Sequence, residues 1–347
     1  MSEGAMRLAR VHGPGDVRLD EVPVPRAGPG EVIVQVRACG ICGSDLSYIA
    51  QGGLGGIEPL SAPLPIGHEL AGVVETVGAG VAGIAPGMRV AVNPDRGFIG
   101  GGGSEGGMAP FLRVSAARLG NTVFPLADHV TFAQGSLAEP LSVALHALRV
   151  AKVTSADKVA VLGAGPIGLC TVAMLRSMGV QHIAIFDRVS ERLDRARALG
   201  AEVACNVETQ GMAEALTEAH GGGERFGAAY VGTDVFIDCA GAAPALTEAF
   251  GVAKYRARIA VVALYKKPVA LDLWRMMANE IAVSGSIADD RPTEFGEALD
   301  LIARGTPDLS PLISHTFDFG SFDKALDVPR NPHRSAKVML TFAGDPA

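Results

Sequence analysis

The feature that most constrains the fold is a glycine motif set between an apolar run and a helical pattern. Gly163-Ala-Gly165-Pro-Ile-Gly168 follows the apolar run Lys158–Leu162 and opens the segment Pro166–Met178, which has proline in its first turn. Asp187 stands 19 residues after Gly168, at the end of the next strand pattern. A strand, a glycine turn, a helix and an acidic residue in this order predict a doubly wound parallel sheet that binds a dinucleotide.

The parts of this motif have physical roles in dinucleotide binding. They supply a tight turn, a backbone that can approach a pyrophosphate, close helix–strand packing, and helix N–H groups directed at the anion. Asp187 can accept hydrogen bonds from the adenosine ribose and would repel a 2′-phosphate, although the adjacent Arg188 can weaken that preference. We therefore expect NAD rather than NADP. The alternative to dinucleotide binding is a strand–helix turn that needs its glycines only for packing. The predicted cofactor residues of the turn are Gly163, Gly165, Pro166, Ile167 and Gly168.

The two parts of the chain differ in texture. From Met6 to about Pro125, short β-rich runs alternate with Gly and Pro, which fits a barrel-like antiparallel fold. After about Ser142, strand and helix patterns alternate, as in a doubly wound parallel sheet. The expected domains are 1–145, 146–287 and a tail, 288–347, that returns to pack on the first domain. Glycine accounts for 44 of the 347 residues, and the glycine-rich patch Gly100–Gly107 predicts a mobile loop.

Composition narrows the partners and the compartment. The net charge is −7 and there is no basic tract, which argues against a nucleic-acid or anionic-membrane surface. The longest uncharged stretch, Val159–Leu175, has 17 residues and is broken by three glycines and a proline, so it is too short to span a membrane. No signal peptide is visible, and the five cysteines are an odd number, unevenly spread. These features predict a cytoplasmic protein with reduced thiols and a small-molecule partner.

A second set of residues has the chemistry of a metal site. Cys42, His68-Glu69 and Glu139 offer a thiolate, an imidazole and carboxylates, which together suit a borderline-soft ion, zinc first. Three protein ligands with an open fourth position would make such a site catalytic. Taken singly, Cys42 could be a buried small hydrophobe, His68 a core histidine and Glu69 a surface charge. The spacing of 26 residues between Cys42 and His68 does not decide among these readings.

The ordered motifs ICGSD, GHE, AEPL and GxGxxG resemble the zinc-containing medium-chain dehydrogenase/reductase family, most of all its sorbitol, idonate and butanediol dehydrogenase branch. The resemblance covers nearly the whole chain. It implies an α/β protein in which a doubly wound Rossmann domain is inserted into a GroES-like β-barrel catalytic domain, with the active site between them. It also implies a zinc-dependent oxidoreductase that interconverts a secondary alcohol or diol and its ketone, with hydride transfer to or from NAD(H).

The resemblance assigns roles at the metal site. Cys42 and His68 match metal ligands, and Glu69 matches a ligand or near-ligand. Glu139 matches a carboxylate that is a ligand in some members and acts through water in others, so the third ligand, Glu69 or Glu139, stays open. Ser44 matches the hydroxyl that hydrogen-bonds the substrate oxygen. Asp45 matches a carboxylate that orients the metal-binding histidine.

Three further positions match the family outside the ligand set. Arg192 matches a contact on the adenosine side of the cofactor. Tyr48 matches a pocket position in the polyol branch, and an ordinary helix-face tyrosine is the alternative. Lys337 matches a tail position that sometimes reaches the cofactor phosphates, and a solvated strand lysine is equally compatible with the sequence.

Three departures from the family limit the assignment. Many relatives carry a four-cysteine structural zinc lobe where this chain reads NPDRGFIGGGGSEGGMAP, so we expect one catalytic zinc and no structural zinc. Relatives often end a proton relay in a histidine where this chain has Ser47, whose hydroxyl can pass a proton but cannot store one near neutral pH. Ala288 stands where sorbitol-type enzymes place an arginine near the substrate, which weakens a sugar-polyol assignment.

Two alternative functions remain at this stage. One is a zinc-independent quinone or enone reductase of the same fold, and the other is a non-catalytic nucleotide-binding protein. The joint presence of Cys42, His68 and Glu69 counts against the first. The family implies a small-molecule alcohol or ketone substrate and a homodimer or homotetramer. The sequence fixes neither the particular substrate nor the number of subunits.

Overall fold

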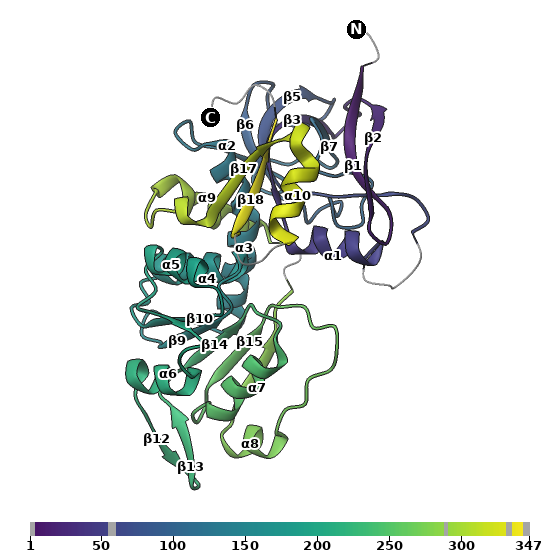
Figure 1. The fold of residues 1–347 in the computed structure, drawn as a ribbon. Coiled ribbons are helices and arrows are strands. Elements are labelled where there is room, and N and C mark those ends of the chain that lie inside the picture. Colours follow the sequence, from purple (N-terminus) through teal and green to yellow (C-terminus); the bar gives the residue numbers. More distant parts are fainter. Residues whose placement is uncertain (1–3, 55–59, 288–290, 331–334, 343–347) are drawn as a thin grey trace. The chain divides into compact units, whose positions relative to one another are not determined.

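The computed structural model describes residues 4–54, 60–287, 291–330 and 335–342, and the chain forms two compact units (Figure 1). Unit 1 consists of Met1–Glu139, Asp289–Arg304 and Ile313–Ala347, and unit 2 of Pro140–Ala288 and Gly305–Leu312. The expected boundaries lay at 145/146 and 287/288, so the first lies six residues further along than the division at Glu139/Pro140. Gly305–Leu312 groups with unit 2, where Arg195 Nη1 donates a hydrogen bond to the Pro311 carbonyl at 2.8 Å.

Unit 2 is built on a six-stranded sheet whose strands are all parallel. The spatial order is β11-β10-β9-β14-β15-β16, which is the 3-2-1-4-5-6 order of a doubly wound nucleotide-binding sheet. Every residue of β9 is buried, as expected for a central strand covered on both faces. The strands are β9 (Val159–Leu162), β10 (Ile183–Asp187), β11 (Val203–Asn206), β14 (Val235–Asp238), β15 (Arg258–Val261) and β16 (Ala282–Gly285).

Helices connect these strands, as the sequence predicts. They are α4 (Pro166–Ser177), α5 (Ser190–Ala198), α6 (Met212–His220), α7 (Ala243–Val252) and α8 (Leu273–Ala278), and α3 (Ala138–Val150) precedes the first strand, β9. One connection differs from the expected pattern, because a hairpin of β12 (Gly222–Arg225) and β13 (Ala228–Val231) follows α6. Gly221 ends α6, and Phe226 and Gly227 adopt the positive φ angles of a tight turn.

Unit 1 contains two sheets. A three-stranded sheet has the order β2-β1-β4, and a seven-stranded sheet has the order β17-β18-β3-β5-β6-β8, with β7 also paired to β3. The strands are β1 (Ala5–Gly13), β2 (Asp16–Pro23), β3 (Val32–Ile41), β4 (Leu64–Pro65), β5 (Glu69–Val77), β6 (Arg89–Val92), β7 (Phe111–Val114), β8 (Val123–Pro125), β17 (Ile313–Asp318) and β18 (Lys337–Thr341). The helices are α1 (Gly43–Gln51), α2 (Phe132–Ser136), α9 (Pro292–Arg304) and α10 (Phe322–Arg330), with short 3₁₀ turns at Ser310–Leu312 in unit 2 and Phe319–Ser321. In unit 1, β18 pairs with β3.

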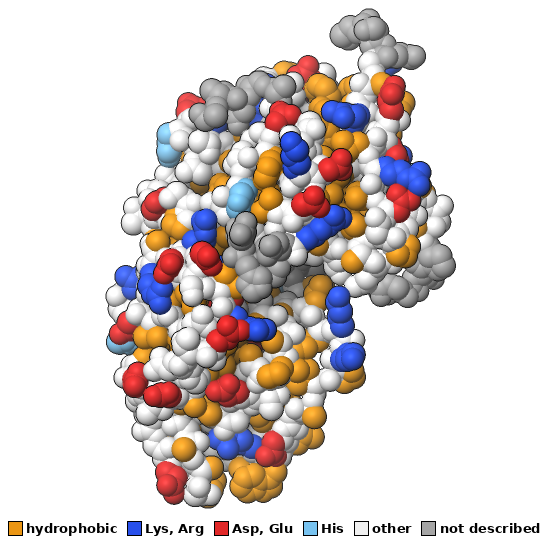
Figure 2. All heavy atoms as spheres, viewed as in Figure 1, with side chains coloured by type: hydrophobic (Ala, Val, Ile, Leu, Met, Phe, Trp, Pro, Cys, Tyr) orange, Lys and Arg blue, Asp and Glu red, His pale blue; other side chains and the backbone are white. Residues whose placement is uncertain are grey.

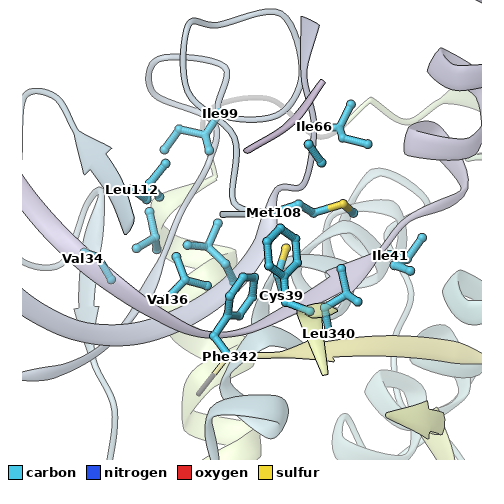
Figure 3. Close-up of a cluster of buried hydrophobic side chains, with 14 of the residues drawn as sticks. Val34, Val36, Cys39, Ile41, Ile66, Ile99, Met108, Leu112, Leu340 and Phe342 are labelled. Atoms are coloured by element: carbon cyan, nitrogen blue, oxygen red, sulfur yellow. The ribbon is translucent and has the colours of Figure 1, made fainter. Parts of the chain in front are cut away.

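The core of unit 1 follows β3 (Figure 3). Val34 and Val36 project into it, and after a register shift between Val36 and Ala38 the core side chains become Cys39 and Ile41. Successive residues of a strand point to opposite faces, and the bulge moves the core face from even to odd positions. Gly40 therefore lies on the face away from this cluster.

The glycine-rich segment Gly100–Gly107, after β6, is fixed by backbone hydrogen bonds. Its composition predicts a mobile loop, and this prediction was wrong. Gly100 N donates to the Glu105 carbonyl at 2.7 Å, and Gly107 N donates to the Gly67 carbonyl at 2.7 Å. The Met108 side chain at the end of the segment is fully buried in the core. The glycines are needed because the segment runs against other backbone, as at Gly107, where a Cβ would lie 3.1 Å from the Gly67 carbonyl oxygen.

The surface carries both charge signs. Figure 2 shows Lys and Arg side chains interspersed with Asp and Glu on the visible face, in keeping with the net charge of −7. Within the described residues, no helix combines the length and apolar character needed to cross a bilayer.

Candidate metal and nucleotide sites

Three of the predicted ligands meet in unit 1. Cys42 precedes α1, His68 lies just before β5, and Glu69 is the first residue of β5. The Cys42 thiol, a ring nitrogen of His68 and a carboxylate oxygen of Glu69 all lie within 4.8 Å of one another. The fold therefore brings together a donor set that the linear spacing left undecided.

Strand pairing and one aspartate bring these residues to the same place. β3 and β5 are antiparallel with Gly40 opposite Glu69, and β3 ends one residue before Cys42. Asp45 Oδ2 accepts a hydrogen bond from the Cys42 amide at 2.8 Å, and Asp45 Oδ1 accepts one from the Gly67 amide at 3.1 Å. Asp45 is fully buried and so links the backbone of the cysteine segment to the backbone beside His68.

The His68 ring lies between Asp45 and Ser44. Its Nδ1 atom is 3.6 Å from Asp45 Oδ1, too far for a hydrogen bond, and its Nε2 atom is 3.3 Å from Ser44 Oγ. Burial lowers the pKa of His68, but the negative charges of Asp45 and Cys42 outweigh it and hold that pKa well above its ordinary value. Asp45 therefore binds backbone amides beside both predicted ligands and acts on the His68 ring through its charge, and its orienting role stays a prediction.

Glu139 is not part of the close ligand group among the described residues. Its Oε1 atom accepts a hydrogen bond from Arg291 Nη2 at 3.0 Å, and the same guanidinium donates to Asp95 Oδ1 at 2.8 Å. Arg291 is only 3% exposed. Burial lowers the pKa of Arg291, but the adjacent Glu139 and Asp95 carboxylates raise it by more. The net effect is a raised pKa, so the guanidinium stays protonated. The two predicted carboxylates thus have different partners.

The three hydroxyl-bearing residues of α1 are placed differently. Ser44 contacts His68, whereas Ser47 Oγ accepts a hydrogen bond from Gln51 Nε2 at 2.9 Å on its own helix. Tyr48 is partly buried, and burial is the main cause that raises the pKa of its hydroxyl. Ser44 is the hydroxyl that contacts a predicted ligand.

Lys337, for which the sequence left a cofactor contact and a solvated strand position equally open, is not solvated. It is 1% exposed, and its Nζ atom donates to Glu69 Oε1 at 2.5 Å and to the Ile41 carbonyl at 3.3 Å. The signal in the sequence was a lysine directly before the apolar run Val338-Met339-Leu340. Only the pairing of β18 with β3 shows which carboxylate it meets.

The nucleotide motif forms the expected strand–turn–helix in unit 2. Gly163 follows β9 with φ +90°, and α4 begins at Pro166 with Gly165 as its N-cap. A Cβ on Gly168 would lie 1.8 Å from the Gly163 carbonyl oxygen, so α4 can approach the turn only with glycine there. Ile167 lies in the first turn of the helix, whose exposed N–H groups are the anion-binding feature of such turns.

Asp187, at the end of β10, is tied to the backbone around this turn. Its Oδ2 accepts a hydrogen bond from Ala164 N at 2.7 Å, and its Oδ1 accepts from the amides of Arg188 and Val189 at 2.7 and 2.9 Å. The Arg188 side chain extends to Glu208, with Nε 2.7 Å from Oε1. Burial lowers the pKa of Arg192, the predicted adenosine-side contact, and the Asp187 charge partly offsets this effect.

The residues of the metal group fit a zinc ion. The Glu69 Oε2 atom is buried and has no hydrogen-bond partner in the described part of the chain. A Cβ on Gly40 would lie 2.1 Å from this oxygen, so the space around it exists only because residue 40 is glycine. Thiolate, imidazole and carboxylate are the donors that zinc binds in catalytic sites.

Comparisons with known proteins agree with the fold. The alcohol dehydrogenase GroES-like domain matches residues 28–126, and the zinc-binding dehydrogenase family matches residues 166–304. Sorbitol dehydrogenase from Pongo abelii is 30% identical over 97% of this chain and 95% of its own length.

Two solved structures extend this similarity. 2R,3R-butanediol dehydrogenase from Bacillus subtilis has a TM-score of 0.85 at 27% identity, covering 97% of this chain and 99% of that one. An alcohol dehydrogenase from Escherichia coli CFT073, complexed with the cofactor NADH, has a TM-score of 0.83 at 27% identity, covering 98% of this chain and 100% of that one. The chain therefore belongs to the zinc-containing medium-chain alcohol dehydrogenase family. The predicted fold class, a GroES-like domain with a Rossmann domain, and the predicted enzyme class, a nicotinamide-dependent oxidoreductase, are confirmed.

Proposed function

We propose that this chain is a zinc-dependent oxidoreductase that interconverts a secondary alcohol or diol and its ketone, with a hydride transferred to or from NAD(H). The observation that carries the proposal is the convergence of Cys42, His68 and Glu69 within 4.8 Å, with one buried Glu69 oxygen left without a partner. A quinone or enone reductase without a metal has no need of this arrangement.

We assign one zinc to Cys42, His68 and Glu69, and we assign Glu139 to Arg291. Zinc bound there would polarise the substrate oxygen and lower the pKa of the substrate hydroxyl. The preference for Glu69 rests on partners, since Arg291 already engages Glu139 while Glu69 keeps one oxygen unpartnered. Glu139 remains within electrostatic range of His68, where its charge contributes to the raised pKa of that ring.

Ser44 is the residue that we expect to hold the reacting proton. Its Oγ atom is 3.3 Å from His68 Nε2, so a substrate oxygen beside the ligand group would lie within reach of this hydroxyl. A serine hydroxyl donates and accepts at the same time, and it can therefore pass the proton on without changing charge. Ser47, which is bound to Gln51, can take part in this relay only if that bond opens. Tyr48 would form part of the pocket wall.

NAD is the cofactor that the nucleotide site favours. The negative Asp187 at the end of β10 is suited to a ribose diol and would repel a 2′-phosphate. Arg188 is directed to Glu208, which leaves it poorly placed to neutralise such a phosphate. Gly165 leaves room at the turn, because a Cβ there would meet no atom closer than 4.0 Å. Arg192 would contact the adenosine side.

The proposed substrate class rests on one sequence position and on one of the solved relatives. Ala288, which stands where sorbitol-type enzymes have an arginine, lies outside the described residues. Its small apolar side chain favours a less polar secondary alcohol or a diol over a sugar polyol. The name of the Bacillus subtilis relative, a butanediol dehydrogenase, points the same way. The cysteines Cys39, Cys42, Cys170, Cys205 and Cys239 are all free thiols, which suits the proposed cytoplasmic location. We expect a homodimer or homotetramer.

Metal analysis combined with a substrate panel tests the proposal. The purified chain should contain about one zinc per subunit and reduce NAD faster than NADP with secondary alcohols and diols. Cys42→Ser should lose both zinc and turnover, while Cys205→Ser, which alters a buried thiol of unit 2, should keep both. Zinc-free protein that reduces quinones or enones would refute the proposal. Nucleotide binding without turnover of any alcohol or ketone would refute it as well.

A further inference from the structure

The two oxygens of the Glu69 carboxylate have different surroundings. The residue is fully buried, and its Oε1 atom accepts a hydrogen bond from Lys337 Nζ at 2.5 Å. Its Oε2 atom has no hydrogen-bond partner among the described residues. Burying a carboxylate with one unsatisfied oxygen is costly unless something else binds that oxygen. The carboxylate is thus held at one oxygen and left available at the other.

Strand register produces this asymmetry. β18, β3 and β5 are neighbours in one sheet, with Met339 opposite Gly40 and Gly40 opposite Glu69. Lys337 begins β18, two residues before Met339, and its Nζ atom also donates to the Ile41 carbonyl on β3 at 3.3 Å. The ammonium is therefore anchored to the backbone of the middle strand while it holds the carboxylate of the outer one.

Gly40 supplies the space for the second oxygen. Cys39 and Ile41 project into the hydrophobic core, as Figure 3 shows, so residue 40 faces the other side of β3. A Cβ at this position would lie 2.1 Å from Glu69 Oε2 and 3.2 Å from Glu69 Cδ. Any side chain at residue 40 would therefore push the carboxylate away from its place.

We propose that Lys337 is a positioning residue that, together with the space at Gly40, makes Glu69 a metal ligand through one oxygen only. Lys337 keeps Oε1 occupied, and Oε2 is then the oxygen available to the ion. Three single-atom ligands leave the fourth position of a tetrahedral zinc site for substrate, whereas a carboxylate that bound through both oxygens would crowd it. Lys337 also neutralises the buried carboxylate when no metal is bound. The inference rests on the proposed zinc site.

A double-mutant cycle between Lys337 and Glu69 tests this role. Lys337→Met, Glu69→Gln and the double variant are compared for Co²⁺ and Zn²⁺ affinity by chelator competition, and for the visible absorption spectrum of the Co²⁺ form. That spectrum reports coordination number and thiolate ligation independently of activity. Lys254→Met is the matched control, since Lys254 Nζ lies 2.5 Å from Asp234 Oδ1 in unit 2, whereas the proposed metal ligands belong to unit 1.

Lys337→Met should weaken metal binding by roughly tenfold to a hundredfold, the usual effect of losing a group that orients a ligand, and should change the Co²⁺ spectrum. In the Glu69→Gln background, the same replacement should change the affinity less than about twofold, because its effect passes through Glu69. Lys254→Met should alter neither the affinity nor the spectrum. If Lys337→Met alone fails to fold, the double variant, which removes both buried charges, still reports the affinity relative to Glu69→Gln.

The outcomes separate this inference from the function it rests on. If Glu69→Gln binds metal like the wild type, Glu69 is not a ligand, and both the proposed site and the inference fail. If Glu69→Gln weakens binding but Lys337→Met changes neither affinity nor spectrum, the inference alone is overturned. A double variant that binds metal far more weakly than Glu69→Gln would also overturn it, because Lys337 would then act by another route.

Discussion

Replacing Gly40 with alanine tests the space around Glu69 by a single added carbon. The alanine Cβ would lie 2.1 Å from Glu69 Oε2, against a normal carbon–oxygen approach of about 3.3 Å. The carboxylate must therefore move by about 1 Å, although Lys337 holds its other oxygen. Overpacking of this kind costs about 1–3 kcal/mol of folding free energy.

The effect of Gly40→Ala on metal binding should be larger than its effect on folding. Ligand positions in metal sites are tolerant to about 0.2 Å, so a shift of about 1 Å removes Glu69 from the ligand set. We expect a loss of zinc affinity of at least tenfold, measured by chelator competition. Urea unfolding of the metal-free protein should show a loss within the 1–3 kcal/mol range, so that the fold survives.

Gly13→Ala is the matched control for this replacement. A Cβ at Gly13 would have no heavy atom within 4 Å, so the change should leave zinc affinity unaltered. If Gly40→Ala, Gly13→Ala and the wild type all bind zinc equally tightly, the absence of a side chain at residue 40 is not needed for metal binding. The account of Glu69 as a ligand in a fixed position would then be wrong.

Three further predictions concern other parts of the chain. Arg291→Met should lower the free energy of unfolding, measured in urea, by about 3–5 kcal/mol. The reason is that the carboxylates of Glu139 and Asp95 would stay buried without their cation. Gly168→Ala should prevent stable folding of unit 2, because its Cβ would lie 1.8 Å from backbone, whereas Gly165→Ala should keep the fold and weaken only NADH binding, followed by fluorescence titration. His220, 2% exposed, has its pKa lowered by burial from 6.5 to about 4, so the unfolded state binds a proton first as the pH falls. The wild type should therefore lose about 2 kcal/mol of stability between pH 7 and pH 5, which His220→Gln should not lose.

Each of these predictions has a contrary result. Arg188→Met, which removes an arginine from an exposed ion pair, is the control for Arg291→Met, and equal stability of the two variants would contradict the role given to the buried cation. Equal NADH affinity of Gly165→Ala and the wild type would mean that the cofactor does not approach the backbone there. Parallel pH–stability curves for the wild type and His220→Gln would show that folding does not lower the pKa of His220.

Local patterns predicted much of the fold, because they act within short windows of sequence. The turn at Gly163–Gly168 and the acid at Asp187 were visible together, since strand, turn and helix follow one another directly. The hairpin Gly222–Val231 was missed, because each of its strands has only four residues and the first begins with two glycines. The loop at Gly100–Gly107 was predicted to be mobile, since composition cannot show the carbonyl groups that its amides meet.

The sequence by itself determined the chemistry available to this protein: a thiol, an imidazole and carboxylates for a metal, and a glycine turn with an acid for a dinucleotide. The tertiary structure decided which cation each carboxylate meets. Glu69 and Lys337 are 268 positions apart, and Glu139 and Arg291 are 152 apart. Pairings at such distances depend on strand register and on the return of the tail to the first unit, and no local periodicity encodes them.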